Sequence, residues 1–255
     1  MRGCTKLLSF IVLGILSCTS VVGCGRMLRG SSSSNTKQAQ SSAKATGDPL
    51  VIVVIDTTQS VISRWSLIRE ATSAFLAQAF KQRDFDLAVI KLNRFPKEAR
   101  RYKSSAFTEE QWTELEKDFQ PGPEGEGTDQ IGAMEEAVRA ARGSGAETPS
   151  AVVLLYFSDM LIDQPKGEPH SFRSWDSFDW RQLKDAGITQ AHFYVIHMAN
   201  PEATGESRAV YRQQQELTDR LSKAASAAGL NAQWVSDSVL EDEVKKGRFT
   251  GPEFE

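Results

Sequence analysis

The alternation of apolar and polar residues divides most of the chain into strands and helices. Continuous apolar runs at residues 50–55 and 150–159 predict strands that are buried on both faces, as in the centre of a parallel sheet. Residues 60–80 and 206–229 instead carry apolar side chains at helical spacing. Because strands and helices alternate along the chain, we predict an α/β fold: a doubly wound, mostly parallel central sheet flanked by helices on both faces.

Shorter patterns complete the expected order of elements. They cover, in chain order, residues 86–93, 100–107, 108–119, 128–142, 188–198, 231–236 and 238–247. Residues 100–107 predict a short edge strand, and 108–119 and 128–142 predict helices. Thr108 and Thr128 stand at the first positions of these two helices, where a hydroxyl side chain can serve as the N-cap.

The first residues have the layout of an export signal. Arg2 and Lys6 are followed by an apolar stretch at 7–16 and then by small residues. The apolar stretch is short for a bilayer span, although a retained membrane anchor is the alternative. The segment ends in "VVGC", which resembles the lipobox of bacterial lipoproteins. The resemblance implies that Cys24 becomes the lipidated N-terminus of an exported protein anchored to a membrane of the bacterial cell envelope.

Composition separates the rest of the chain into regions. Residues 1–23 are the expected signal peptide, and 24–47, rich in Ser, are an expected flexible tether. Residues 48–248 form the expected domain, and 249–255 a C-terminal tail. All three cysteines fall within residues 1–24, so no disulfide is expected in the domain. The net charge of −3 and the absence of a basic block in the domain argue against nucleic acid as a partner.

Three separate segments place oxygen-bearing side chains at the expected carboxyl edge of the sheet. Asp56, Thr58 and Ser60 follow the first strand, Thr128 follows a Gly-rich loop, and Asp159 ends the second apolar strand. Ligands of doubly wound sheets bind at this edge. Carboxylates and hydroxyls are hard ligands that suit Mg²⁺, Mn²⁺ or Ca²⁺ better than Zn²⁺. A cap for the following helix is the plainer interpretation of the first segment.

This constellation resembles the metal-ion-dependent adhesion site of von Willebrand factor type A (vWA) domains, in which an Asp-x-Ser-x-Ser loop, a distant Thr and a distant Asp occur in that order. The resemblance covers about residues 48–240. It implies a metal held by the five residues named above, and a protein partner that offers an acidic side chain to the metal. Thr58 departs from the usual Ser but keeps the hydroxyl. Met160 stands where many members have Gly, so we expect that loop to be shaped differently.

Other functions are less consistent with the sequence. Haloacid dehalogenase-like phosphatases need a second acid two residues after the first, where this chain has Thr58. No P-loop, no G-x-S-x-G and no H-E-x-x-H motif occurs, so we assign no catalytic residues and expect a binding module and not an enzyme. A metal-free scaffold of an envelope complex stays open as an alternative.

An aromatic-rich segment at residues 170–183 follows Asp159. Its four large aromatic side chains either form part of a recognition surface or cover the sheet as an ordinary element; they are Phe172, Trp175, Phe178 and Trp180.

Overall fold

The computed structural model describes residues 47–82, 84–103, 108–119, 126–143, 148–197 and 204–249. They belong to one structural unit, residues 43–255. The expected signal peptide, Cys24 and all but the last residue of the expected tether lie outside the described residues. Within the described part of the chain, no helix is both long and apolar enough to cross a membrane.

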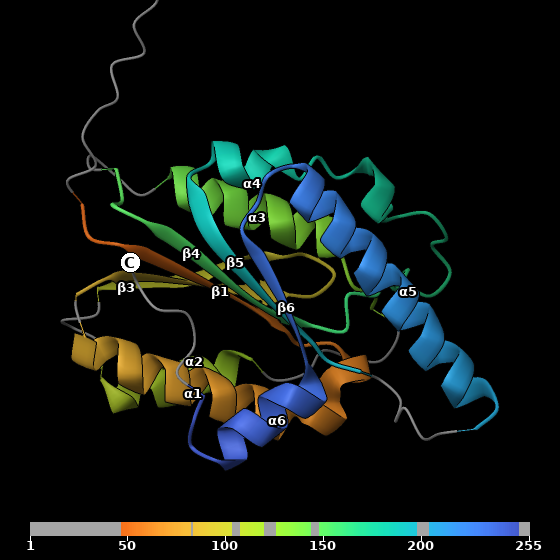
Figure 1. Cartoon of the computed structure of the whole chain (residues 1–255), viewed down its shortest axis with the longest axis horizontal. Helices are drawn as coiled ribbons and strands as arrows, with labels where there is room; N and C mark the ends of the chain where they lie inside the picture. Colours follow the sequence, from red (N-terminus) through yellow and green to blue (C-terminus); the bar gives the residue numbers. More distant parts are fainter. Residues whose placement is uncertain are drawn as a thin grey trace, which may run out of the picture. The chain divides into compact units, whose positions relative to one another are not determined.

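Six strands form one sheet with the spatial order β3-β2-β1-β4-β5-β6 (Figure 1). All neighbouring strands are parallel except β2 and β3, which are antiparallel. The strands are β1 (Leu50–Asp56), β2 (Asp86–Leu92), β3 (Lys97–Lys103), β4 (Val152–Ser158), β5 (Ile188–Val195) and β6 (Ala232–Ser236). Every residue of β1 and β4 is buried, as their unbroken apolar runs predict. The predicted doubly wound, mostly parallel sheet is confirmed.

Helices cover both faces of this sheet (Figure 1). One face packs against α1 (Trp65–Gln82), α2 (Glu109–Asp118) and α6 (Asp237–Lys245). The other packs against α3 (Gln130–Arg142), α4 (Arg181–Asp185) and α5 (Glu206–Ala227). Two short 3₁₀ helices, η1 (Gln59–Arg64) and η3 (Trp175–Ser177), lie in the loops after β1 and β4. Because side chains alternate along each strand, each central strand contributes to both cores.

Several boundaries differ from the predicted ones. The helix expected from residue 60 begins as η1 and becomes α-helical only at Trp65. The edge strand begins at Lys97, three residues early, because residues 97–98 already pair with the end of β2. The predicted cap at Thr108 is confirmed: its hydroxyl accepts a hydrogen bond from the Gln111 N–H, and the Gln111 side chain accepts one from the Thr108 N–H. The Phe249 ring packs against a β5 side chain, so packing extends to the first residue of the expected tail.

The strand order has a topological switch point at one edge of the sheet. From β1 the chain runs outward to β2 and β3, then returns to the other side of β1 as β4 and continues outward to β5 and β6. The strand order therefore reverses between β1 and β4, which is where ligands of such sheets bind. Ile55 is paired with Phe157, so Asp56 and Ser158 are the next residues along the two neighbouring strands. Asp159 follows directly.

Candidate functional site

Asp56 is fully buried at the end of β1 and is held by hydroxyl groups on both carboxylate oxygens. Its Oδ1 accepts hydrogen bonds from the Thr58 N–H at 2.9 Å and the Thr58 hydroxyl at 2.6 Å. Its Oδ2 accepts one from the Ser158 hydroxyl at 2.6 Å. Burial raises the pKa of Asp56, and the hydrogen bonds from Ser158 and Thr58 oppose this shift. The Thr58 and Ser60 hydroxyl oxygens lie 2.9 Å apart.

Asp159 is also buried, directly after β4, but it has fewer partners. Its Oδ1 accepts a hydrogen bond from the Leu161 N–H at 2.9 Å. Its Oδ2 is buried and has no hydrogen-bond partner among the described residues. Burial, followed by repulsion from Asp56, raises the pKa of Asp159 to about 7, although the nearby Ser60 hydroxyl and the Leu161 N–H oppose the shift. The structure thus brings two of the three predicted segments into direct contact.

The third segment is placed at the same edge by its backbone. Thr128 is buried, and its N–H donates to the carbonyl of Asp163, in the loop that follows Asp159. Gly127 allows this approach, because it has a φ of 84° and a Cβ there would lie 2.6 Å from the same carbonyl oxygen. The predicted cap at Thr128 is wrong by one residue: Asp129 is the N-cap of α3, and its carboxylate accepts from the Gly132 N–H. The Thr128 side chain is therefore not used as a cap.

The loop after Asp159 keeps a backbone conformation that favours glycine. Met160 has a φ of 64°, in the left-handed region, and its side chain is fully buried. This φ is one that glycine adopts readily, and the expected difference in loop shape stays a prediction. The conformation is held by a hydrogen bond from the Met160 N–H to the Ser158 hydroxyl at 3.1 Å and one from the Trp175 indole N–H to the Met160 carbonyl at 2.8 Å. Burial of the methionine side chain offsets the backbone strain.

Sequence reasoning missed a set of buried polar residues behind the site. The Gln130 amide donates to the Ser158 hydroxyl at 2.7 Å and accepts from the Tyr156 hydroxyl at 2.8 Å. On α5, the buried Gln214 amide donates to the carbonyls of Asp159 and Ile196. Gln130 and Gln214 occupy inward positions of amphipathic helices, where an apolar residue is the usual choice. A glutamine at an inward helix position was the sequence signal that could have revealed this set, since buried polar groups require hydrogen-bond partners.

Three of the four aromatic residues considered for a recognition surface are buried. Trp175, Phe178 and Trp180 are at most 7% exposed and pack with one another, with ring centroids 5.4–6.3 Å apart. Trp180 also packs on β5 and β6 residues. They form part of the core between the sheet and α4, which is the alternative considered from the sequence. Only Phe172 is partly exposed.

The donor set fits a small hard cation. Two ligands at right angles around an ion at about 2.1 Å would lie about 3 Å apart, close to the separation of the Thr58 and Ser60 hydroxyl oxygens. The unpartnered Asp159 Oδ2 is the kind of buried acceptor that a cation would satisfy. No group of three or more His, Cys, Asp or Glu side chains suited to a metal occurs in the described part of the chain. The candidate site therefore depends on hydroxyl oxygens for most of its ligands.

Comparison with known proteins finds similarity in structure only. No family model matches the sequence, and no curated protein matches it. A von Willebrand factor type A protein from Catenulispora acidiphila is similar at a TM-score of 0.45 and 14% identity, over 82% of this chain and 44% of that one. The PilB minor pilin from Streptococcus sanguinis has a TM-score of 0.47 at 10% identity, over 83% and 64%.

A third match is the conserved hypothetical protein BatB from Bacteroides thetaiotaomicron, with a TM-score of 0.45 and 12% identity, over 79% of this chain and 98% of that one. The chain thus spans less than half of the first of these proteins and just under two thirds of the second. At such identities and with TM-scores below 0.5, these similarities say nothing about function. The site must be interpreted from its own residues.

Proposed function

We propose that this chain is a divalent-cation-dependent binding module, with a vWA-like metal site that binds an acidic group of a protein partner or surface ligand. Asp56, Thr58, Ser60, Thr128 and Asp159 would hold Mg²⁺, with Mn²⁺ or Ca²⁺ as alternatives. The observation that carries the proposal is the pair of buried carboxylates at neighbouring strand ends, one of which has an oxygen without a partner among the described residues. Two such charges, buried without a cation, repel each other.

The residues have separable roles in this proposal. Asp56 and Asp159 balance the charge of the ion, while the hydroxyls of Thr58, Ser60 and Thr128 add ligands without adding charge. A bound divalent cation would supply a positive centre to which an external carboxylate can bind. The Thr58 hydroxyl donates its proton to Asp56, so its oxygen acts as an acceptor, toward the Ser60 hydroxyl 2.9 Å away or toward an ion. Both carboxylates act as metal ligands in this proposal, so we propose no catalysis.

A metal-free interaction scaffold is the second candidate, and one observation favours it. Both carboxylate oxygens of Asp56 already accept hydrogen bonds from the protein, so this residue does not need a cation to be satisfied. We further propose, from the N-terminal sequence, that the module is exported and anchored to a membrane of the cell envelope through lipidated Cys24.

Thermal unfolding of the full chain with and without Mg²⁺ separates the two candidates. A ligand that binds only the folded state at one hundred times its Kd stabilises it by about 2.7 kcal/mol, so millimolar Mg²⁺ should raise the Tm by several degrees. Mn²⁺ and Ca²⁺ are measured in parallel, and EDTA gives the metal-free reference. The shift should disappear in Asp56→Asn and in Asp159→Asn.

Asp219→Asn is the matched control, because it makes the same change at an exposed position of α5. It should keep the full metal-dependent shift. If wild-type protein that is folded by circular dichroism shows no shift with any of the three cations, the metal proposal fails and the scaffold is supported. An equal loss in the Asp219→Asn control would show that the shift reflects general charge and not this site.

A further inference from the structure

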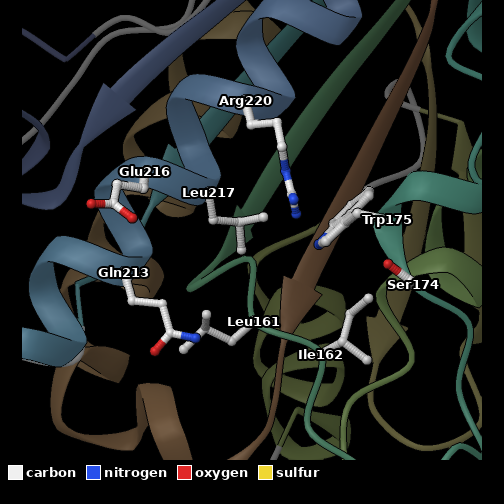
Figure 2. A pocket seen from close by; sticks show the side chains of 8 residues that line it. All are labelled: Leu161, Ile162, Ser174, Trp175, Gln213, Glu216, Leu217 and Arg220. Carbon is white, nitrogen blue, oxygen red and sulfur yellow. The ribbon is translucent and has the colours of Figure 1, made fainter.

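A groove lies beside the candidate metal site, between α5 and the loop that follows β4 (Figure 2). Its volume is about 500 Å³, in the range of small-molecule sites in proteins. Its lining is mixed: Leu161, Ile162, Trp175 and Leu217 provide apolar surface, and Ser174, Gln213, Glu216 and Arg220 provide polar surface. Because Trp175 is only 4% exposed and is fixed by its hydrogen bond to the Met160 carbonyl, this wall is held in place by the core.

Arg220 places a cation at the groove, and its ion pair with Asp176 is long and exposed. The side chain of Arg220 is 59% exposed, and its Nη1 lies 3.8 Å from Asp176 Oδ1, which is beyond hydrogen-bond distance. Figure 2 shows the Arg220 side chain extending toward Trp175, whereas the carboxylate of Glu216 points away from Trp175. The guanidinium therefore faces the apolar walls and can pair with an anion that lies between them.

We propose that this groove binds a small anionic amphiphile, with an aromatic or aliphatic body and one carboxylate or sulfonate head. The body would lie against Leu161, Ile162, Trp175 and Leu217, and the head would pair with the Arg220 guanidinium. Arg220 favours an anionic head on the Trp175 side of the groove, away from the Glu216 carboxylate that also lines it, and the apolar side chains favour an amphiphile over a free inorganic anion. This part of the inference does not depend on the metal site.

The groove is physically joined to the candidate metal site through the segment Asp159–Leu161. Leu161 lines the groove, and its N–H donates to Asp159 Oδ1. Trp175, on the same side, donates to the Met160 carbonyl at 2.8 Å. From α5, the other wall, Gln214 donates to the Asp159 carbonyl at 2.8 Å. Because the Trp175 wall is held by the core, a ligand that shifts α5 against this wall would act on the position of Asp159 through Gln214.

We infer that the two sites are coupled, and this second part rests on the proposed metal function. Binding free energies couple reciprocally, so Mg²⁺ should change the affinity of the groove for its ligand by the factor by which the ligand changes the affinity for Mg²⁺. Couplings of this kind are typically about fivefold or more.

Two fluorescent probes with the same type of aromatic body test the groove. The probe 1-anilinonaphthalene-8-sulfonate carries an anionic head, and N-phenyl-1-naphthylamine lacks it. Both are titrated into the full chain, its Arg220→Glu variant and an Arg212→Glu control. Arg212 is also exposed on α5 but does not line the groove. Because both variants replace Arg by Glu, they have the same net charge. Circular dichroism establishes that each variant is folded.

We expect Arg220→Glu to weaken binding of the anionic probe about five- to tenfold and to change binding of the neutral probe less than twofold. The control should change neither. The groove proposal is overturned if the two variants weaken the anionic probe equally, if Arg220→Glu leaves it unchanged, or if wild-type protein does not bind the neutral probe at all.

The titration of the anionic probe is then repeated in EDTA and in saturating Mg²⁺. An affinity change of about fivefold supports the coupling. If Mg²⁺ stabilises the protein but leaves the probe affinity unchanged, the coupling alone is overturned. If Mg²⁺ fails to stabilise the protein even without probe, the metal function and the coupling both fall, while the groove is judged separately by the variants.

Discussion

Without metal, the protein should lose stability as pH rises toward neutrality, and Asp159 should be the main cause. Burial and the neighbouring Asp56 raise the pKa of Asp159 in the folded protein to about 7, from an ordinary value of 3.8. Between these two pH values the folded state holds a proton that the unfolded state has released. Stability therefore falls with increasing pH in this window and levels off above about pH 7.

The size of the effect follows from the difference between the two pKa values. Each pKa unit corresponds to 1.36 kcal/mol, so the change from 3.8 to about 7 corresponds to about 4 kcal/mol at most. That is a large part of the 5–15 kcal/mol typical of a folded domain. Mg²⁺ requires the ionised carboxylate, so its stabilising effect should appear as pH rises through about 7 and disappear at acidic pH.

Urea unfolding in EDTA at pH 4.5–8.5 measures this effect, with Asp159→Asn as the reference. The reference is necessary because His192 opposes the trend: burial lowers its pKa to about 4, so it destabilises the fold as pH falls below its ordinary value of 6.5. That contribution cancels in the difference between the two proteins. A difference that stays flat, or that grows in favour of the wild type as pH rises, would refute the proposed state of Asp159.

Two further predictions concern positions outside the proposed ligands. Met160→Gly should destabilise the protein by about 1–4 kcal/mol in urea unfolding, because losing a fully buried Met side chain outweighs the 1–2 kcal/mol of relieved left-handed strain; a more stable variant would show that the strain dominates. Mass spectrometry of the mature N-terminus after expression in a bacterium should show an acylated Cys24, and an unmodified Cys24 or an intact signal would contradict the lipoprotein proposal.

The sequence predicts the fold better than it predicts the residues that surround the candidate site. Apolar runs fix β1 and β4 because a strand covered on both faces needs apolar residues at every position. The segments carrying Asp56 and Asp159 then follow from topology alone, since parallel strands end at one edge. The role of Ser158 did not follow, because its partners, Asp56 and Gln130, are far away in sequence. Pairings of this kind depend on how helices and strands pack, which local patterns do not encode.

The aromatic segment at residues 170–183 also shows that local sequence does not determine which side chains are buried. From the sequence, Phe178 and Trp180 form either part of a recognition surface or, the preferred interpretation, part of the core, since the same large apolar faces serve both. What decides between them is the short chain from η3 to α4, which turns these rings toward β5. Trp175 then acquires a role through its indole N–H, which holds the Met160 carbonyl next to Asp159.

The two carboxylates of the site differ in a way that fits a site able to exist with and without its ion. Asp56 is anchored by hydroxyl donors on both oxygens, so its position does not depend on a cation. Asp159 keeps one oxygen without a partner among the described residues. Burial and repulsion from Asp56 disfavour its charged form, so a cation or a proton would stabilise it. In the absence of the ion, a proton can neutralise Asp159 near neutral pH. The cost of burying two acids is then reduced, and the proposed metal site would gain affinity for a cation as that proton is lost.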